Sequence, residues 1–391
     1  MRTRNKRLLL VAFLCGLFLF SAVHTSAQCA GGTRPTANDP LDMLVVGDSI
    51  MWGQGLNRER KFWWRIKCWI EEKTDRPVRE KIEAHSGASI ESAGTELAYS
   101  RNAEVPSFTP TVNQQVTAAR QHYVDPAAVD LVLVNGCIND VDVRNLLNAA
   151  TNPERLEVSI KEACGDRMQR LLTRISREFP SAHLVVTGYY NIFSSETDHN
   201  RFTRMLVKNL TSRTSDQKEM SDKEMRSRLV AISDLWYRVS TASLRNAVNT
   251  VNSELAERRI HFAEIDFQPE HAFAAPESLL WNFKFASTNL SGLRQAIVIL
   301  SLGTAAYKPN DQVRELRSRS CKEIYEALKK KKETKQEKQV RESSYLACRY
   351  ASLGHPNQMG ALIYTEAIKG QLLPIINNWR WSKVHPVVTG E

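Results

Sequence analysis

A serine stands at the end of an apolar run near the start of the chain. Residues Leu44, Val45 and Val46 lead directly into Gly47-Asp48-Ser49, so we expect a buried strand to end here and to place the serine at a sheet edge. In an open α/β sheet, ligands bind just outside the carboxyl ends of the strands. A serine hydroxyl becomes an effective nucleophile when a base takes its proton. Ser49 is therefore a candidate nucleophile, and the chain should also supply a base and donors for an oxyanion.

Among nine histidines, His355 best fits the role of the base. It lies in a short turn, followed by Pro356, immediately before an apolar helical pattern over 358–376. Proline restricts the backbone of such a turn. His271, which follows the fifth expected strand, is a weaker rival. A single histidine is more often structural than catalytic, but its combination with Gly-Asp-Ser in one domain favours His355 as the general base.

Two further loops carry possible oxyanion donors. A tetrahedral acyl intermediate requires hydrogen-bond donors directed at its developing negative charge. Gly87 follows the second expected strand and, having no side chain, can bring its backbone N–H close to a substrate. Asn139 follows the third expected strand, and Ser49 has its own backbone N–H. Each loop alone is typical of an ordinary turn, but their positions at successive strand ends indicate one site.

These residues resemble the four sequence blocks of the SGNH hydrolases, also called GDSL-type esterases and lipases. The blocks stand in the family's order between residues 41 and 376: Gly47-Asp48-Ser49, Gly87, Asn139-Asp140 and His355-Pro356-Asn357. The resemblance implies a Ser–His esterase with a three-donor oxyanion hole; no cofactor is expected, and no Cys or His spacing in the chain suggests a zinc site. It implies that Ser49 and His355 are catalytic, and that the Ser49 N–H, the Gly87 N–H and the Asn139 side chain form the oxyanion hole. Asp48 and Asp140 would be supporting residues.

The chain departs from the family pattern at two positions. Many members have Gly-x-Asn-Asp in the third block, whereas here one more residue separates Gly136 from Asn139. The acid that usually lies three residues before the histidine is replaced by Ser352. A triad needs a partner that orients the imidazole, and a backbone carbonyl or a distant acid such as Asp140 or Asp142 could supply it. We expect a dyad, with no carboxylate oxygen within hydrogen-bond reach of the distal ring nitrogen of His355.

The elements that must position these residues can be predicted from apolar patterning. Five short runs are continuous rather than alternating, which is typical of strands buried in a parallel sheet; they cover 43–46, 81–84, 131–134, 184–187 and 261–265. Helical patterns separate them, at 62–70, 153–179 and 228–258, and a last one covers 358–376. Strands that alternate with helices predict a three-layer α/β/α, flavodoxin-like domain with a five-stranded parallel sheet.

Two stretches exceed this minimal pattern, and we expect them to be insertions near 194–222 and 307–345. The first is polar. The second contains a basic segment, 314–341, in which glutamates interleave with lysines and arginines at helical spacing. This pattern favours an exposed charged helix. The segment lacks interleaved aromatic residues, so no nucleic-acid partner is expected, although the formal net charge is +10.

The first residues predict export. Basic residues at 2–7, an apolar run over 8–23 and small residues at 25–27 match a secretory signal peptide, which we place at 1–27 before a hydrolase domain at 28–391. The apolar run is short for a membrane span, so no stable membrane insertion is expected after cleavage. Six cysteines follow the signal, and their even number suggests disulfides. Proximity in sequence favours the pairs Cys137–Cys164 and Cys321–Cys348.

Three functions remain open on these patterns. The first is a secreted or extracytoplasmic serine esterase that hydrolyses carboxylic esters of small molecules, lipids or glycans. The second is an O-acyltransferase using the same site, and the third is a non-catalytic binding module of the same fold. The chain lacks the Gly-x-Ser-x-Gly elbow of α/β-hydrolases and a phosphate-binding glycine loop, and the sequence favours the first function. Aromatic stretches at 189–193 and 279–283 are candidates for an apolar lip of the substrate cleft, with core packing as the alternative.

Overall fold

A computed structural model describes residues 29, 35–37, 39–91, 102–107, 109–198, 220–284 and 308–376. Residues 35–391 form one compact unit and 1–34 a second, of which Cys29 is described. The predicted signal peptide at 1–27 lies outside the described residues, as does most of the predicted insertion at 194–222.

The core of the larger unit is a parallel sheet of five strands in the order β2-β1-β3-β4-β5. The strands are β1 (Leu41–Val46), β2 (Val78–Ile82), β3 (Val129–Val134), β4 (His183–Thr187) and β5 (Ile260–Ala263). Each neighbouring pair is parallel, which confirms the predicted five-stranded α/β fold. The second strand begins three residues before the predicted 81–84. It is an edge strand with partly exposed, charged side chains, so it lacks the continuous apolar run that marks the central strands.

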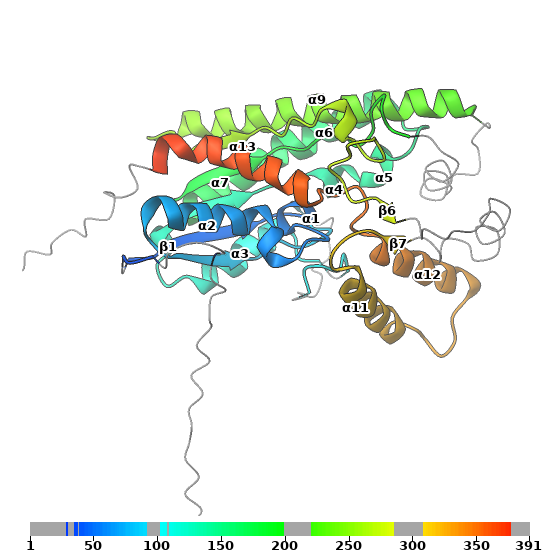
Figure 1. The fold of residues 1–391 in the computed structure, drawn as a ribbon, viewed down its shortest axis with the longest axis horizontal. Helices are drawn as coiled ribbons and strands as arrows, with labels where there is room; N and C mark the ends of the chain where they lie inside the picture. The colour runs from blue at the N-terminus through cyan, green and yellow to red at the C-terminus, as the bar shows by residue number, and fades with distance from the viewer. Residues whose placement is uncertain are drawn as a thin grey trace, which may run out of the picture. The chain divides into compact units, whose positions relative to one another are not determined.

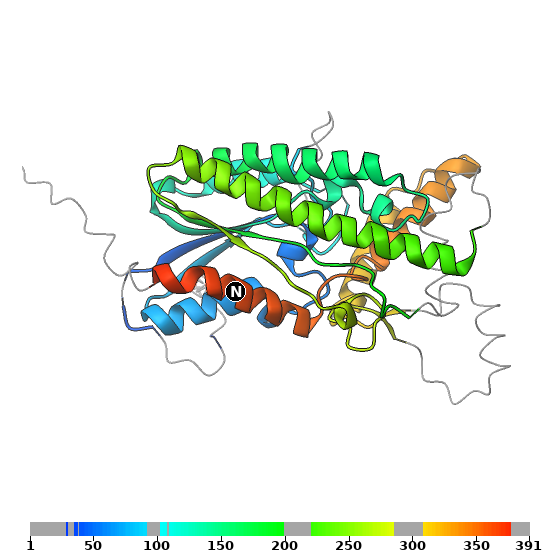
Figure 2. The same ribbon diagram turned by 90° about the horizontal axis from the view of Figure 1, so that it is seen from above.

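Helices cover both faces of this sheet (Figures 1 and 2). On one face α2 (Phe62–Thr74) packs against α13 (Gln358–Ile376). On the other, α9 (Asp222–Glu254) packs against α6 (Pro153–Ile160) and α7 (Met168–Glu178), and α7 also contacts α3 (Val112–His122). The shorter helices are α1 (Ser49–Trp52), η1 (Arg58–Arg60), η2 (Pro126–Ala128), α4 (Ile138–Val141), α5 (Val143–Leu146) and η4 (Pro269–His271).

Two of the predicted helices differ in detail from the pattern. The stretch predicted over 153–179 contains a π-helical segment, η3 (Lys161–Arg167), between α6 and α7. The helix predicted from residue 228 begins at Asp222, because the Ser221 side chain accepts the Glu224 N–H and caps an earlier start. The last helix has the predicted bounds.

The charged segment forms a pair of helices, α11 (Arg314–Ala327) and α12 (Lys335–Arg349), rather than one helix. Figure 1 shows them side by side, apart from the layers around the sheet. A disulfide joins Cys321 to Cys348, and Val105 packs against it as part of one buried cluster. A two-stranded antiparallel ribbon, β6 (Phe283–Lys284) and β7 (Lys308–Pro309), also belongs to this part of the chain.

Both disulfides favoured by the sequence are confirmed, Cys137–Cys164 and Cys321–Cys348. Cys29 and Cys68 are also disulfide-bonded, so all six cysteines after residue 28 are oxidised. None of the helices in the described ranges combines the length and the apolarity needed to cross a bilayer.

Candidate active site

Ser49 stands where the sequence predicts, at the carboxyl end of the sheet. Strand β1 ends at Val46, and Ser49 is the first residue of α1. Between them Gly47 has a φ of 148°, and a Cβ there would lie 2.0 Å from the Asn135 side-chain oxygen. Only a glycine fits this close approach. The strand therefore turns sharply into α1 and brings the serine to the sheet edge.

The structure brings His355 to Ser49 across 306 positions of sequence. The Nε2 atom of His355 lies 2.6 Å from the Ser49 Oγ. The rival histidine, His271, instead uses its Nδ1 to accept the Gln268 N–H within its own turn. Ser49 and His355 therefore have the separation that proton transfer from a hydroxyl to a base requires.

Backbone pairing holds the turn that carries His355. The Trp281 N–H donates to the His355 carbonyl at 2.7 Å, and the Gly354 N–H donates to the Trp281 carbonyl at 3.0 Å. The Tyr190 hydroxyl donates to the Gly354 carbonyl at 2.7 Å. Trp281 and Tyr190 are buried. These residues of the aromatic stretches at 189–193 and 279–283 therefore pack in the interior and support this turn, rather than forming an apolar lip of the substrate cleft.

Burial of the His355 imidazole lowers its pKa to about 4, because charging a ring removed from water is unfavourable. The Leu353 carbonyl and the Asp311 carboxylate act in the opposite direction, and the Arg317 guanidinium lowers the pKa further. The ring is thus neutral near pH 7, as a general base must be. In the part of the chain that the structure describes, the His355 Nδ1 has no hydrogen-bond partner.

Asp48 is fully buried and ties α1 to the ends of two neighbouring strands. Its carboxylate accepts the Ile50 N–H at 2.8 Å, the Asn135 side-chain amide at 2.9 Å and the Tyr189 hydroxyl at 2.8 Å. Burial raises the pKa of Asp48, and these three donors act against that shift. Sequence reasoning missed Asn135 and Tyr189, although each is a polar residue within two positions of a strand end, β3 and β4 respectively.

The loops after β2 and β3 are joined to each other by two hydrogen bonds. The Asn139 side-chain amide donates to the Ala88 carbonyl at 2.8 Å, and Asp140 accepts the Ile90 N–H at 2.8 Å. An amide carries two N–H groups, so Asn139 keeps a second donor. Gly87 has a φ of 84°. Among the hydrogen bonds of the described residues, none uses the backbone N–H of Ser49 or Gly87 as a donor. Neither N–H group is therefore committed to another described acceptor.

The two acids that sequence left open as partners of His355 are engaged elsewhere. Asp140 pairs with Arg167 at 3.2 Å, and Asp142 pairs with Arg144. Ser352, at the position of the family's usual acid, donates its hydroxyl to Asp311 at 2.7 Å. Asp311 lies 44 residues before His355, and no local sequence pattern pointed to it.

Comparisons with known proteins give fold-level likenesses only. No protein-family model matches the chain, and no curated protein matches it. Solved structures of lipases and carbohydrate esterases do match. An extracellular lipase from Streptomyces rimosus is 15% identical over 61% of this chain and 87% of its own, with a TM-score of 0.36.

A phospholipase A1 from Streptomyces albidoflavus NA297 is 12% identical over 63% of this chain and 89% of its own, with a TM-score of 0.35. A putative GDSL-like lipase from Parabacteroides merdae is 12% identical over 86% of this chain and 98% of its own, with a TM-score of 0.31. The structural neighbours of this chain are therefore lipases and carbohydrate esterases, one of them GDSL-like, and the likeness is one of fold.

Proposed function

We propose that the protein is a serine esterase that hydrolyses carboxylic esters through Ser49 and His355. The observation that carries the proposal is the 2.6 Å contact between the Ser49 Oγ and the His355 Nε2. A neutral imidazole at this distance can accept the hydroxyl proton as the oxygen attacks an ester carbonyl. The lowered pKa of His355 keeps the ring in the neutral form that this step needs.

The reaction then follows from the donors around Ser49. Attack forms a tetrahedral intermediate, whose oxyanion would accept hydrogen bonds from the Ser49 N–H, the Gly87 N–H and the free Asn139 amide hydrogen. Protonated His355 next donates its proton to the leaving alcohol oxygen, which leaves an acyl group on Ser49. Water, deprotonated by His355, attacks this acyl-enzyme, and the second intermediate collapses to the acid as His355 returns the proton to the Ser49 oxygen. Asp48 and Asp140 support the geometry by holding α1 and the oxyanion loops in place.

The proposed compartment is secreted or extracytoplasmic. Its support is the basic and apolar pattern at 1–27, together with the oxidation of all six later cysteines. Disulfides form and persist mainly in oxidising compartments. The proposed substrates are esters of small molecules, lipids or glycans, with no cofactor.

The test is hydrolysis of p-nitrophenyl esters from acetate to palmitate by wild type, Ser49→Ala and a matched control, Ser253→Ala. Ser253 is an exposed serine on α9. We expect Ser49→Ala to lower kcat by a factor on the order of 10³ or more, while Ser253→Ala stays within about twofold of wild type because its exposed hydroxyl bonds the Thr250 carbonyl of its own helix. Equal rates for wild type and Ser49→Ala would overturn the nucleophile assignment. A wild type inert on every ester, acylated glycans included, would favour an acyltransferase or a binding module instead.

A further inference from the structure

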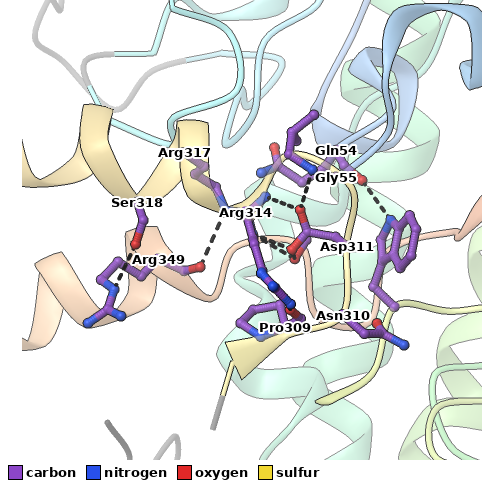
Figure 3. Close-up of polar contacts among 12 residues, drawn as sticks. Gln54, Gly55, Pro309, Asn310, Asp311, Arg314, Arg317, Ser318 and Arg349 are labelled. Atoms are coloured by element: carbon purple, nitrogen blue, oxygen red, sulfur yellow. Dashed lines mark hydrogen bonds and ion pairs between the residues drawn. The ribbon is translucent and has the colours of Figure 1, made fainter. Parts of the chain in front are cut away.

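A buried ion-pair cluster lies where the charged helices meet the rest of the unit (Figure 3). The Arg317 side chain, on α11, is 0% exposed. Its Nη1 donates to Glu104 at 2.9 Å and to Asp311 at 3.0 Å, and its Nη2 pairs with Asp311 at 2.5 Å. Burying an arginine with two carboxylates costs desolvation free energy, and removing one partner of such an ion pair strongly destabilises the fold. Arg317 therefore has a fixed position.

One end of this cluster holds the loop that follows Ser49. Glu104 accepts three hydrogen bonds from that loop: from the Trp52 indole N–H at 2.7 Å, from the Gln54 side-chain amide at 2.9 Å and from the Gly55 N–H at 3.1 Å. Trp52 is the last residue of α1, the helix that Ser49 begins. Arg317 is thus linked to the loop after Ser49 through the Glu104 carboxylate.

The other end holds the turn that carries His355. The Ser352 hydroxyl donates to Asp311 at 2.7 Å and accepts from the Arg317 Nη2 at 3.0 Å. The Ser352 carbonyl in turn accepts the His355 N–H at 3.0 Å. Ser352 is fully buried, so nothing in solvent competes for these bonds. Arg317 is thus linked to the turn that carries His355 through Asp311 and Ser352.

The two sides also touch directly at Gly55, which Figure 3 shows beside Asp311. Gly55 has a φ of 87°, and a Cβ there would lie 2.6 Å from the Trp281 indole nitrogen and 3.0 Å from the Asp311 Cβ. Trp281 is the residue that pairs with the His355 backbone. The serine loop, the histidine turn and Asp311 therefore converge on one close-packed point.

We propose that Arg317, Asp311 and Ser352 are positioning residues that set the separation of Ser49 and His355, in place of the acid absent from position 352. This inference rests on the proposed function and deepens it, because it names three residues outside the strand-end loops that would position the catalytic pair. A shift of about 1 Å between reacting groups can cost on the order of 10²-fold in rate. Loosening the cluster should therefore act on kcat and leave substrate binding almost unchanged.

The test compares Ser352→Ala and Asp311→Asn with a matched control, Ser318→Ala. Ser318, also on α11, accepts a hydrogen bond from Arg349 at 3.1 Å but has no bond to the histidine turn. We expect Ser352→Ala and Asp311→Asn to lower kcat for a p-nitrophenyl ester by about 10- to 100-fold, with KM within about twofold of wild type. Ser318→Ala should keep both constants within about twofold. Thermal unfolding of each variant confirms that the protein is folded at the assay temperature.

Arg317→Met, a larger change, is added as a fourth variant, and if it does not fold the first two decide the question. Folded Ser352→Ala and Asp311→Asn proteins with kcat within twofold of wild type would overturn the proposal.

A second readout separates this proposal from the proposed function. A fluorophosphonate probe labels an activated serine without needing the natural substrate, and Ser49→Ala is its blank. If wild type labels at Ser49 but hydrolyses no ester, the ester substrate is wrong, and slower labelling of the two variants still supports the positioning role. Labelling at the wild-type rate in both variants contradicts it, and a wild-type Ser49 that neither reacts with esters nor labels overturns both proposals.

Discussion

The two sides of the Ser49–His355 pair are held in different ways. Ser49, Gly87 and Asn139 follow three neighbouring strands, β1, β2 and β3, so the sheet itself brings them together. His355 lies outside this framework, in a turn fixed by Trp281 and, through Ser352, by the ion pair between Asp311 and Arg317 of α11. The first arrangement comes from the core fold, whereas the second depends on contacts made outside the sheet, by Trp281 with His355 and by Asp311 and Arg317 with Ser352. We therefore expect single substitutions outside the sheet to shift His355 more readily than Ser49.

The largest effect should come from removing the base itself. We expect His355→Gln to lower kcat for an ester by a factor on the order of 10³ or more, because no other described base contacts the Ser49 hydroxyl. The matched control is His271→Gln, which changes the rival histidine at the end of η4. Steady-state kinetics on p-nitrophenyl esters measures both. A His271→Gln protein that loses activity while His355→Gln keeps it would reverse the assignment of the base.

The next effect concerns the environment of the histidine side. A base works only when it is neutral, so kcat/KM should fall as the pH drops through the pKa of His355 in the free enzyme. That pKa is lowered to about 4, so about 90% of the base is neutral at pH 5, against about 3% for an unperturbed histidine of pKa about 6.5. A pH–rate profile of kcat/KM should show its acid limb well below pH 6. An acid limb centred at 6.5 or above would show that the ring is not desolvated as described.

The smallest effect is on stability, at the point where the two sides meet. We expect Gly55→Ala to destabilise the fold by about 1–3 kcal/mol, because the added methyl meets Trp281 and the backbone is left-handed. The control is Gly370→Ala on α13, where a Cβ would meet nothing within 4 Å and where alanine should stabilise a helix by up to about 1 kcal/mol. Urea unfolding should give opposite signs for the two variants. A neutral Gly55→Ala would show that the sides do not converge tightly at this residue.

The contrast between the two sides also explains what the sequence could reveal. The central strands are continuous apolar runs, so their positions were predictable, and Ser49, Gly87, Asn139 and His355 follow from a motif tied to strand ends. Apolar patterning predicts the start of the edge strand β2 three residues late, because the side chains of this strand are charged and half exposed.

The cluster around Arg317 had no such signal. Arg317 is one arginine in a basic run whose pattern predicts a solvated helix, and most of that run is indeed exposed. Of its carboxylate partners, Glu104 stands 213 residues away, and Asp311 stands six residues before Arg317, ahead of the helix and outside its i, i+4 spacing. Only the folded chain shows that this one charge is buried. Polar contacts of this kind leave no periodicity in a sequence. The sequence therefore shows that Ser352 stands where the family usually has an acid, but not which residues Ser352 contacts.

The central claim, that Ser49 takes up an acyl group with His355 as its base, can be tested by trapping that intermediate. Wild type, Ser49→Ala and His355→Gln would be mixed rapidly with a p-nitrophenyl ester, quenched in acid and examined by intact-mass and peptide mass spectrometry. We expect one acyl adduct on wild type, located on Ser49, none on Ser49→Ala and slow or no acylation of His355→Gln. An adduct on another residue, or turnover of the ester by Ser49→Ala at the wild-type rate, would contradict this claim.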